Sequence, residues 1–255
     1  MGDQDSEPRG RCTRAARTRK FLSTRRAEAS GPAGRLISLL LPLAAWTFLS
    51  LSCSGPAPKT GAPPATDLVE IVSLDPTIHL DIRYATSNNF VGRPVYPEAR
   101  AYLQRPAAEA LVAAQRWLKG RGYGIVVFDA YRPLSVQKIF WEITPPEKRM
   151  FVADPAVGSH HNRGCAADVG LYDLKTGAEV EMPGGYDETS ERSFVVYAGG
   201  TLEQRQARDL LREAMERDGY FFVYPEEWWH YDYKDWRDYP VLDVAFSAIK
   251  PPRKD

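Results

Sequence analysis

The sequence predicts a single α+β domain with a mostly antiparallel sheet flanked by helices. Helix-like and strand-like segments are mixed along the chain, without the regular βαβ alternation that a parallel sheet requires. The composition, with 44% hydrophobic and 26% charged residues, is that of an ordinary globular protein. The patterned region runs from about residue 68 to about residue 248, which is long enough for one domain with one core.

The first elements are indicated by the period of their apolar residues. Residues 69–74 alternate between apolar and polar side chains and predict a strand, and residues 82–85 predict a second extended segment. Residues 105–119 predict a helix that has Pro106 in its first turn and Gly120 directly after its end. We therefore expect two short strands before the first long helix.

The later elements alternate in the same irregular way. Residues 123–128 are β-branched and aromatic and predict a buried strand, residues 134–143 predict a helix, and residues 167–174 predict a strand. A capping box, Thr201-Leu-Glu-Gln204, begins a helix that Gly219 ends. Residues 220–223 then predict a strand that runs into the segment Glu227-Trp-Trp-His230.

Charge is unevenly distributed along the chain. Residues 1–35 carry nine Lys or Arg and four Asp or Glu, whereas the remainder holds 24 basic and 29 acidic residues. The acidic balance of the main domain argues against nucleic acid as a partner. The basic arm is better explained by targeting.

The segment after the basic arm is typical of an export signal. Residues 36–52 read LISLLLPLAAWTFLSLS, which is short for a membrane span of about 20 residues but suits the apolar core of a secretory signal. Cys53 follows directly, as in the lipobox of bacterial lipoproteins, although Ser50 stands where that motif prefers Leu. We expect an exported protein, either periplasmic or anchored to a membrane through a lipidated Cys53; a plain secretory signal and an uncleaved anchor are the alternatives.

These boundaries divide the chain into four parts. They are a basic arm and signal segment (1–52), a flexible tether rich in Pro, Gly and Ala (53–67), the folded domain (68–248) and a polar tail (249–255).

Three of the four histidines fall in two short segments that are typical of a metal site. His161, Asp168 and His230 could supply three ligands to one zinc ion per chain, which leaves a fourth position open for water. His160 adjoins His161 and is expected to point elsewhere. Cys165 should face away from Asp168, because residues an odd number apart in a strand lie on opposite faces.

Two further residues have the chemistry of a hydrolytic site. Glu227 lies three residues before His230, and the two intervening Trp should form apolar walls that raise the pKa of its carboxyl group. A base with a pKa near neutrality is suited to activating water. Arg132 follows a buried strand and is well placed to face a reaction centre, although a salt bridge to Asp129 would also explain it.

Taken together, the motifs resemble the D-alanyl-D-alanine dipeptidase family, the VanX type of zinc peptidases. The matching segments are Ser159-x-His161-x-x-Gly164-x-Ala166-x-Asp168, Glu227-Trp-Trp-His230, Asp81-Ile-Arg-Tyr-Ala-Thr-x-Asn-Asn-Phe90, Asp129-Ala-Tyr-Arg-Pro133 and Tyr186-Asp187. The resemblance implies hydrolysis of D-Ala-D-Ala to two D-alanines by a zinc metallopeptidase.

The resemblance also implies a role for each matching residue. His161, Asp168 and His230 match zinc ligands, and Glu227 matches the base that activates water. The remaining matches are the oxyanion-stabilising Arg132 and two substrate-binding residues, Asp187 for the free amino terminus and Ser159.

The sequence departs from the family pattern in two places. Tyr186 stands where Phe is usual, and the stretch from Arg132 to His161 is short, so we expect a more open cavity wall and looser selection of the dipeptide. A zinc D,D-carboxypeptidase acting on peptidoglycan stem peptides is the alternative function. A non-catalytic wall-binding lipoprotein is a third.

Overall fold

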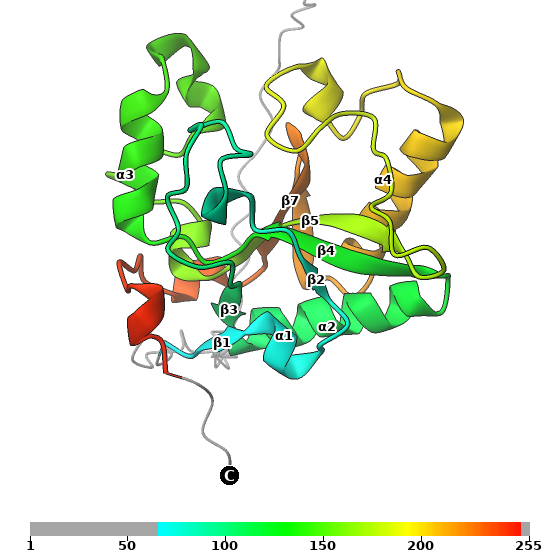
Figure 1. Cartoon of the computed structure of the whole chain (residues 1–255), viewed down its shortest axis with the longest axis horizontal. Coiled ribbons are helices and arrows are strands. Elements are labelled where there is room, and N and C mark those ends of the chain that lie inside the picture. Colours follow the sequence, from blue (N-terminus) through cyan, green and yellow to red (C-terminus); the bar gives the residue numbers. More distant parts are fainter. Residues whose placement is uncertain (1–65, 251–255) are drawn as a thin grey trace, which may run out of the picture. The chain divides into compact units, whose positions relative to one another are not determined.

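The computed structural model describes residues 66–250, which form two sheets and four α-helices joined by loops and short 3₁₀ turns (Figure 1). The strands are β1 (Leu68–Glu70), β2 (His79–Leu80), β3 (Tyr102–Gln104), β4 (Tyr123–Asp129), β5 (Ala166–Asp173), β6 (Phe221–Tyr224) and β7 (Glu227–Tyr233). The helices are α1 (Ile71–Leu74), α2 (Arg105–Lys119), α3 (Leu134–Ile143) and α4 (Leu202–Glu216). The predicted basic arm, signal segment and Cys53 lie outside the described residues.

The central sheet confirms the predicted α+β class. Its five strands are ordered β2-β4-β5-β7-β6, and every neighbouring pair is antiparallel except β2 with β4. Strands β1 and β3 form a separate antiparallel pair. In the register of the central sheet, Asp168 on β5 lies opposite Asp129 on one side and His230 on the other. The sheet therefore places three polar side chains from three strands in one row.

Helices cover both sides of the central sheet. Figure 1 shows α2 along one side and α3 on the other. Helix α2 buries an apolar stripe that includes Leu111 and Leu118, and its buried Gln115 accepts a 2.7 Å hydrogen bond from the backbone N–H of Ile125 on β4. This side-chain bond ties the helix to the strand that precedes the site.

The three long helices, α2, α3 and α4, lie where the sequence predicts them. Helices α2 and α3 have the predicted bounds, and α4 begins with the predicted capping box, in which the N–H of Gln204 donates to the Thr201 hydroxyl at 3.2 Å. Gly219 has a left-handed φ of 69° and follows the last turn of α4. Within residues 66–250 no helix combines the length and apolar character that a membrane span needs.

Two predicted strands are wrong in part. The strand expected over 69–74 ends at Glu70, because the chain turns into α1, where the N–H of Asp75 bonds to the carbonyl of Ile71 at 3.3 Å. The extended segment expected over 82–85 is a 3₁₀ turn, Arg83–Ala85, that buries the Tyr84 ring. In both segments tertiary contacts override the local alternation of side chains.

Candidate metal-dependent active site

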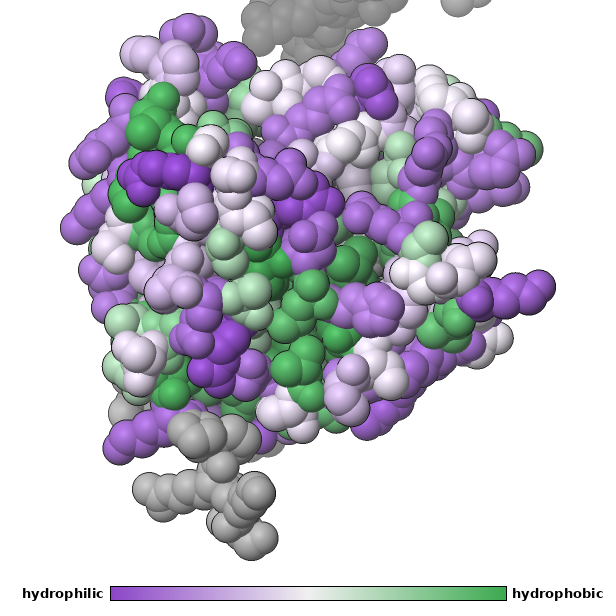
Figure 2. Space-filling view, in the orientation of Figure 1, coloured by the Kyte–Doolittle hydropathy of each residue, from purple (hydrophilic) through white to green (hydrophobic). Residues whose placement is uncertain are grey.

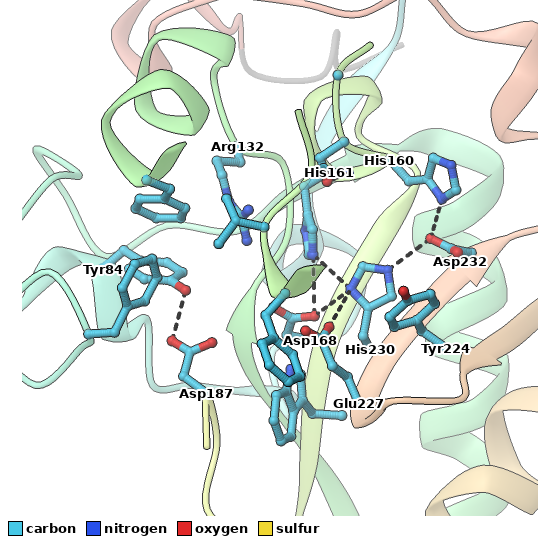
Figure 3. Close-up of a pocket in the computed structure, with 18 of the residues that line it drawn as sticks. Tyr84, Arg132, His160, His161, Asp168, Asp187, Tyr224, Glu227, His230 and Asp232 are labelled. Carbon is cyan, nitrogen blue, oxygen red and sulfur yellow. Dashed lines mark hydrogen bonds and ion pairs between the residues drawn. The ribbon is translucent and has the colours of Figure 1, made fainter. Parts of the chain in front are cut away.

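Three side chains converge at the junction of β5, β7 and the turn before β5 (Figure 3). Nε2 of His161 lies 3.2 Å from Oδ1 of Asp168 and 3.1 Å from Nδ1 of His230. Nδ1 of His230 lies 3.0 Å from the same Asp168 oxygen. The structure thus brings together all three predicted ligands, each presenting one atom to a common point.

The geometry and chemistry of these three residues fit zinc. Ligand atoms about 2.0–2.1 Å from a tetrahedral zinc ion lie roughly 3.3 Å from one another, close to the separations seen here. Two imidazoles and one carboxylate are a donor set that zinc accepts, and three protein ligands leave one position open. His161, Asp168 and His230 would therefore hold the ion.

Hydrogen bonds set both imidazole rings in the required tautomer. Nδ1 of His161 donates to the carbonyl of Ala130 at 2.7 Å, which leaves the lone pair of Nε2 free to bind a metal ion. Nε2 of His230 donates to Asp232 at 2.9 Å, which leaves Nδ1 free. Each ring is thus oriented by a partner outside the metal-binding group.

The site is strongly anionic. Burial opposes ionisation of Asp168, but the neighbouring His161 and His230 hold its pKa well below the usual range. Burial likewise opposes charge on His230, yet the hydrogen-bonded Asp168 and Asp232 raise its pKa well above the ordinary value. A cation at this point, whether a proton on His230 or a metal ion, compensates the two carboxylates.

Asp232 and His160 extend the network on the far side of His230. Nδ1 of His160 lies 2.6 Å from Oδ1 of Asp232, and the His160 ring stacks on Trp236 at a centroid distance of 3.8 Å. As predicted, His160 points away from the three ligands, although with His230 and Asp232 it forms a second group that could hold a cation. The first group is the better metal site because His161 and Asp168 are buried and Glu227 lies 3.8 Å from Nδ1 of His230, the ring atom that faces this group.

Glu227 lies at the start of β7, beside the predicted ligands. Its Oε2 is 3.8 Å from Nδ1 of His230, and burial raises the pKa of its carboxyl group to about 7. The prediction of two apolar walls is half wrong: Trp229 lines the cavity, whereas Trp228 lines a different one. Glu227 has the pKa and the position of a general base.

Arg132 follows β4 and is held rigidly at the cavity wall. Its guanidinium donates to Asp129 at 2.7 Å and 3.0 Å and to Gln137 at 2.8 Å. The predicted salt bridge and the predicted position facing the site are therefore both present. A guanidinium has five N–H donors, so these three bonds leave two for a ligand in the cavity.

Asp187 lies on a loop, at the wall of the cavity across from His230 (Figure 3). Its backbone is left-handed, with a φ of 60°, and its Oδ2 accepts a 2.8 Å hydrogen bond from the Tyr84 hydroxyl. Burial raises the pKa of Asp187 to about 8. A half-buried carboxyl group of this kind gains from a cationic partner, such as an ammonium group.

Ser159 both lines the cavity and supports the turn that carries His161. Its hydroxyl accepts a 3.2 Å hydrogen bond from the N–H of His161, and its own N–H donates to Asn162 at 2.7 Å.

Cys165 is buried, and burial raises the pKa of its thiol to about 12. It belongs to neither metal-binding group in the described residues, as predicted.

Tyr186 has a role that the sequence did not reveal. Its hydroxyl donates to Oδ2 of Asp168 at 3.0 Å, and its ring packs against Phe128 and Trp229. The second carboxylate oxygen of Asp168 is thereby occupied while Oδ1 faces the two histidines. Asp232 also has a role that the sequence did not reveal. Its only signal in the sequence is its place two residues after His230, on the same face of a strand.

The fold and the site define a hydrolase with a metal-binding donor set in a cavity of about 250 Å³. A family model described as "Peptidase_M15: D-ala-D-ala dipeptidase" matches residues 64–248, and the chain belongs to this family of peptidases. This confirms the resemblance seen in the sequence motifs.

Individual proteins agree with the family match. The chain is 33% identical over 187 residues to the D-alanyl-D-alanine dipeptidase of Escherichia coli (strain K12), covering 73% of this chain and 95% of that protein. It is 33% identical over 195 residues to the enzyme of the same name from Enterococcus faecium, covering 66% and 96%. A solved structure of VanYB in complex with D-alanine-D-alanine covers 54% of this chain and 75% of that chain at 15% identity, but its TM-score of 0.34 is too low to carry an argument.

Proposed function

We propose that the protein is a zinc-dependent dipeptidase that hydrolyses D-Ala-D-Ala to two D-alanines, with one zinc ion per chain. The observation that carries the proposal is the arrangement of the cavity. The metal-binding group lies next to a carboxyl group poised near neutrality, and Arg132 and Asp187 line the same space. The names of the relatives support the choice of substrate.

The ion would be held by His161, Asp168 and His230. Zinc in such a site polarises a carbonyl group and lowers the pKa of water bound to it to about 7. The residues of this chain would supply the rest of the chemistry.

In the reaction, water adds across the peptide bond, with its oxygen forming a bond to the carbonyl carbon. Glu227 takes a proton from the attacking water and delivers it to the nitrogen of the leaving D-alanine as the carbon–nitrogen bond breaks. The two free N–H groups of Arg132 stabilise the negative charge that develops on the carbonyl oxygen. Asp129 and Gln137 hold that guanidinium in place before the substrate arrives.

Asp187 favours a free dipeptide over a longer peptide. Its half-buried carboxyl group would pair with the amino terminus of the substrate, and Ser159, which lines the same cavity, would also contact the substrate. An acylated amine carries no charge and would leave Asp187 unpaired. This argues against the D,D-carboxypeptidase alternative, whose stem-peptide substrates have no free amine at this position.

The test is turnover of D-Ala-D-Ala by the zinc-loaded protein, measured as free D-alanine, beside N-acetyl-D-Ala-D-Ala. Glu227→Gln is the control, because it keeps the three zinc ligands and removes only the base. We expect hydrolysis of the free dipeptide, little of the acetylated one, and a loss of about 10²–10⁴-fold in the variant. Equal rates on both substrates would favour the carboxypeptidase, and zinc binding without hydrolysis would favour a wall-binding protein.

We also propose that the domain is exported and is attached to a membrane through a lipidated Cys53. The apolar run 36–52 and the cysteine directly after it support this. The substrate would then be dipeptide released from the cell wall. Metabolic labelling with palmitate, compared between the wild type and Cys53→Ser, tests it; labelling that persists in the variant rules out Cys53 as the site.

A further inference from the structure

A second cavity adjoins the catalytic one. It has a volume of about 260 Å³, comparable with that of the catalytic cavity. The two share part of their walls, including Asp187, Glu227 and Trp229. The second cavity extends from there toward the end of α3 and the turn that follows it, where Ile143 and Pro145 line it.

The walls of this second cavity are mainly apolar. The apolar lining residues are Phe90, Ile143, Pro145, Phe151, Val152 and Trp229. The Thr144 hydroxyl is bonded to the carbonyl of Phe140 at 2.7 Å, so its polar group is already satisfied. Three carboxyl groups, those of Asp187, Glu188 and Glu227, also lie on the wall with one cationic side chain, Lys148. The carboxyl groups outnumber the ammonium group, which disfavours an acidic occupant.

Apolar side chains are also exposed around this cavity. Phe90 is 44% exposed and Ile143 is 45% exposed, and both line it. Figure 2 shows hydrophobic side chains at the surface over α3 and the following turn, among hydrophilic ones. Grouped exposed apolar side chains beside a cavity are typical of a binding site.

The shared walls indicate which part of a dipeptide reaches this space. In the proposed function the amino group lies at Asp187 and the scissile carbonyl lies near Glu227. The atom between these two groups in a dipeptide is the α-carbon of the amino-terminal residue. Its side chain leaves from that carbon, between Asp187 and Glu227, where the two cavities meet. The catalytic cavity holds the predicted metal ligands and the reacting groups, so the second cavity is the space left for the side chain.

We propose that this second cavity binds the side chain of the amino-terminal residue, and that it accepts uncharged apolar side chains larger than methyl. The proposal rests on the proposed dipeptidase function and widens its substrate class to D,D-dipeptides such as D-Leu-D-Ala. The short segment between α3 and His161 supplies much of the apolar wall.

The experiment measures kcat/KM for D-Ala-D-Ala, D-Leu-D-Ala and N-acetyl-D-Ala-D-Ala with the zinc-loaded wild type and two variants. Ile143→Ser removes an apolar wall of the second cavity. Leu174→Ser is the matched control, since Leu174 is 41% exposed and lines neither cavity. We expect kcat/KM for D-Leu-D-Ala to lie within about tenfold of that for D-Ala-D-Ala. Ile143→Ser should lower the ratio of kcat/KM for D-Leu-D-Ala to kcat/KM for D-Ala-D-Ala by about tenfold or more. Leu174→Ser should leave that ratio unchanged.

Each other outcome decides between the claims. Cleavage of D-Ala-D-Ala without cleavage of D-Leu-D-Ala, or the same ratio in Ile143→Ser as in the wild type, overturns the side-chain site and leaves the dipeptidase function standing. Rapid cleavage of the acetylated substrate means that the cavity admits chain beyond the amine, which also overturns it. Cleavage of D-Leu-D-Ala alone supports the site and corrects the substrate, whereas no turnover of any dipeptide overturns both proposals.

Discussion

The proposed metal-binding side of the cavity and its proposed amine-binding side are built differently. On the metal side, Asp168 and His230 lie opposite each other on paired strands, and His161 is fixed by a hydrogen bond to Ala130. On the amine side, Asp187 lies on a loop with a left-handed backbone, and the wall of the adjoining cavity comes from the end of α3 and the following turn.

This difference separates two tasks. Metal ligands must be held to within a fraction of an ångström, which paired strands and hydrogen bonds to the ligand side chains achieve. Substrate selection tolerates more variation, and loops on a rigid scaffold usually carry it. Changes on the metal side should therefore abolish activity, and changes on the amine side should alter its dependence on substrate and pH.

The largest expected effect is that of His230→Ala. It leaves only two of the three donors, so we expect loss of both zinc and turnover, measured as metal content per chain and D-alanine release. Glu227→Gln, which lies on the same strand, should keep zinc and lose turnover. A fully loaded His230→Ala protein together with a metal-free Glu227→Gln protein would reverse the assignment of ligand and base.

Arg132→Lys should lower kcat by about 10²–10³-fold with zinc content unchanged. A lysine ammonium cannot pair with Asp129 and Gln137 and still present two donors to the cavity. The matched control is Arg208→Lys, which also replaces a buried arginine but one on α4 that lines neither cavity. Equal kcat values for the wild type and Arg132→Lys would show that the positive charge is sufficient and that the paired N–H groups of the guanidinium are not needed.

The sequence predicts the metal side better than the amine side, because strands with a local pattern carry most of the metal side, whereas loops carry the amine side. Helices 105–119 and 134–143 and the strand that carries Asp168 follow from local periodicity and from Pro and Gly signals. The three ligands follow from motif spacing. The 3₁₀ turn at Arg83–Ala85 does not, because Tyr84 is buried by contacts with residues far along the chain.

The partners of the ligands were also beyond the sequence. The bond from Tyr186 to Asp168 links a loop to β5, and the chain from His160 through Asp232 to His230 depends on the end of β7 meeting the turn before β5. No local pattern encodes such pairings. The second cavity is likewise lined by segments far apart in the sequence, among them the end of α3, the Asp187 loop and Trp229.

Tyr186→Phe tests whether a loop residue helps to hold a strand-borne ligand. It removes only the hydroxyl that donates to Asp168, so zinc affinity should fall by about 10–100-fold while the protein remains folded. Competition with a chelator measures the affinity. Tyr172→Phe is the control, because its buried hydroxyl bonds to the carbonyl of Thr77 at 2.6 Å, away from the site. Equal affinities in all three proteins would mean that Asp168 is positioned by its strand alone.

The smallest expected effect is a change in how stability depends on pH, on replacing Asp187 with Asn. Burial raises the pKa of Asp187 to about 8, whereas an unfolded aspartate has a pKa of about 3.9. Between these values the folded, metal-free protein holds a proton that the unfolded chain has lost, so this carboxyl group lowers the free energy of unfolding as pH rises. Asn can still accept from Tyr84 and tolerates the left-handed backbone, so it removes only the titration. The unfolding free energy of Asp187→Asn minus that of the wild type should therefore be more positive at pH 9 than at pH 5. Urea unfolding of chelator-treated protein measures this difference. A difference in unfolding free energy that is the same at both pH values would show that Asp187 is already ionised in the folded protein.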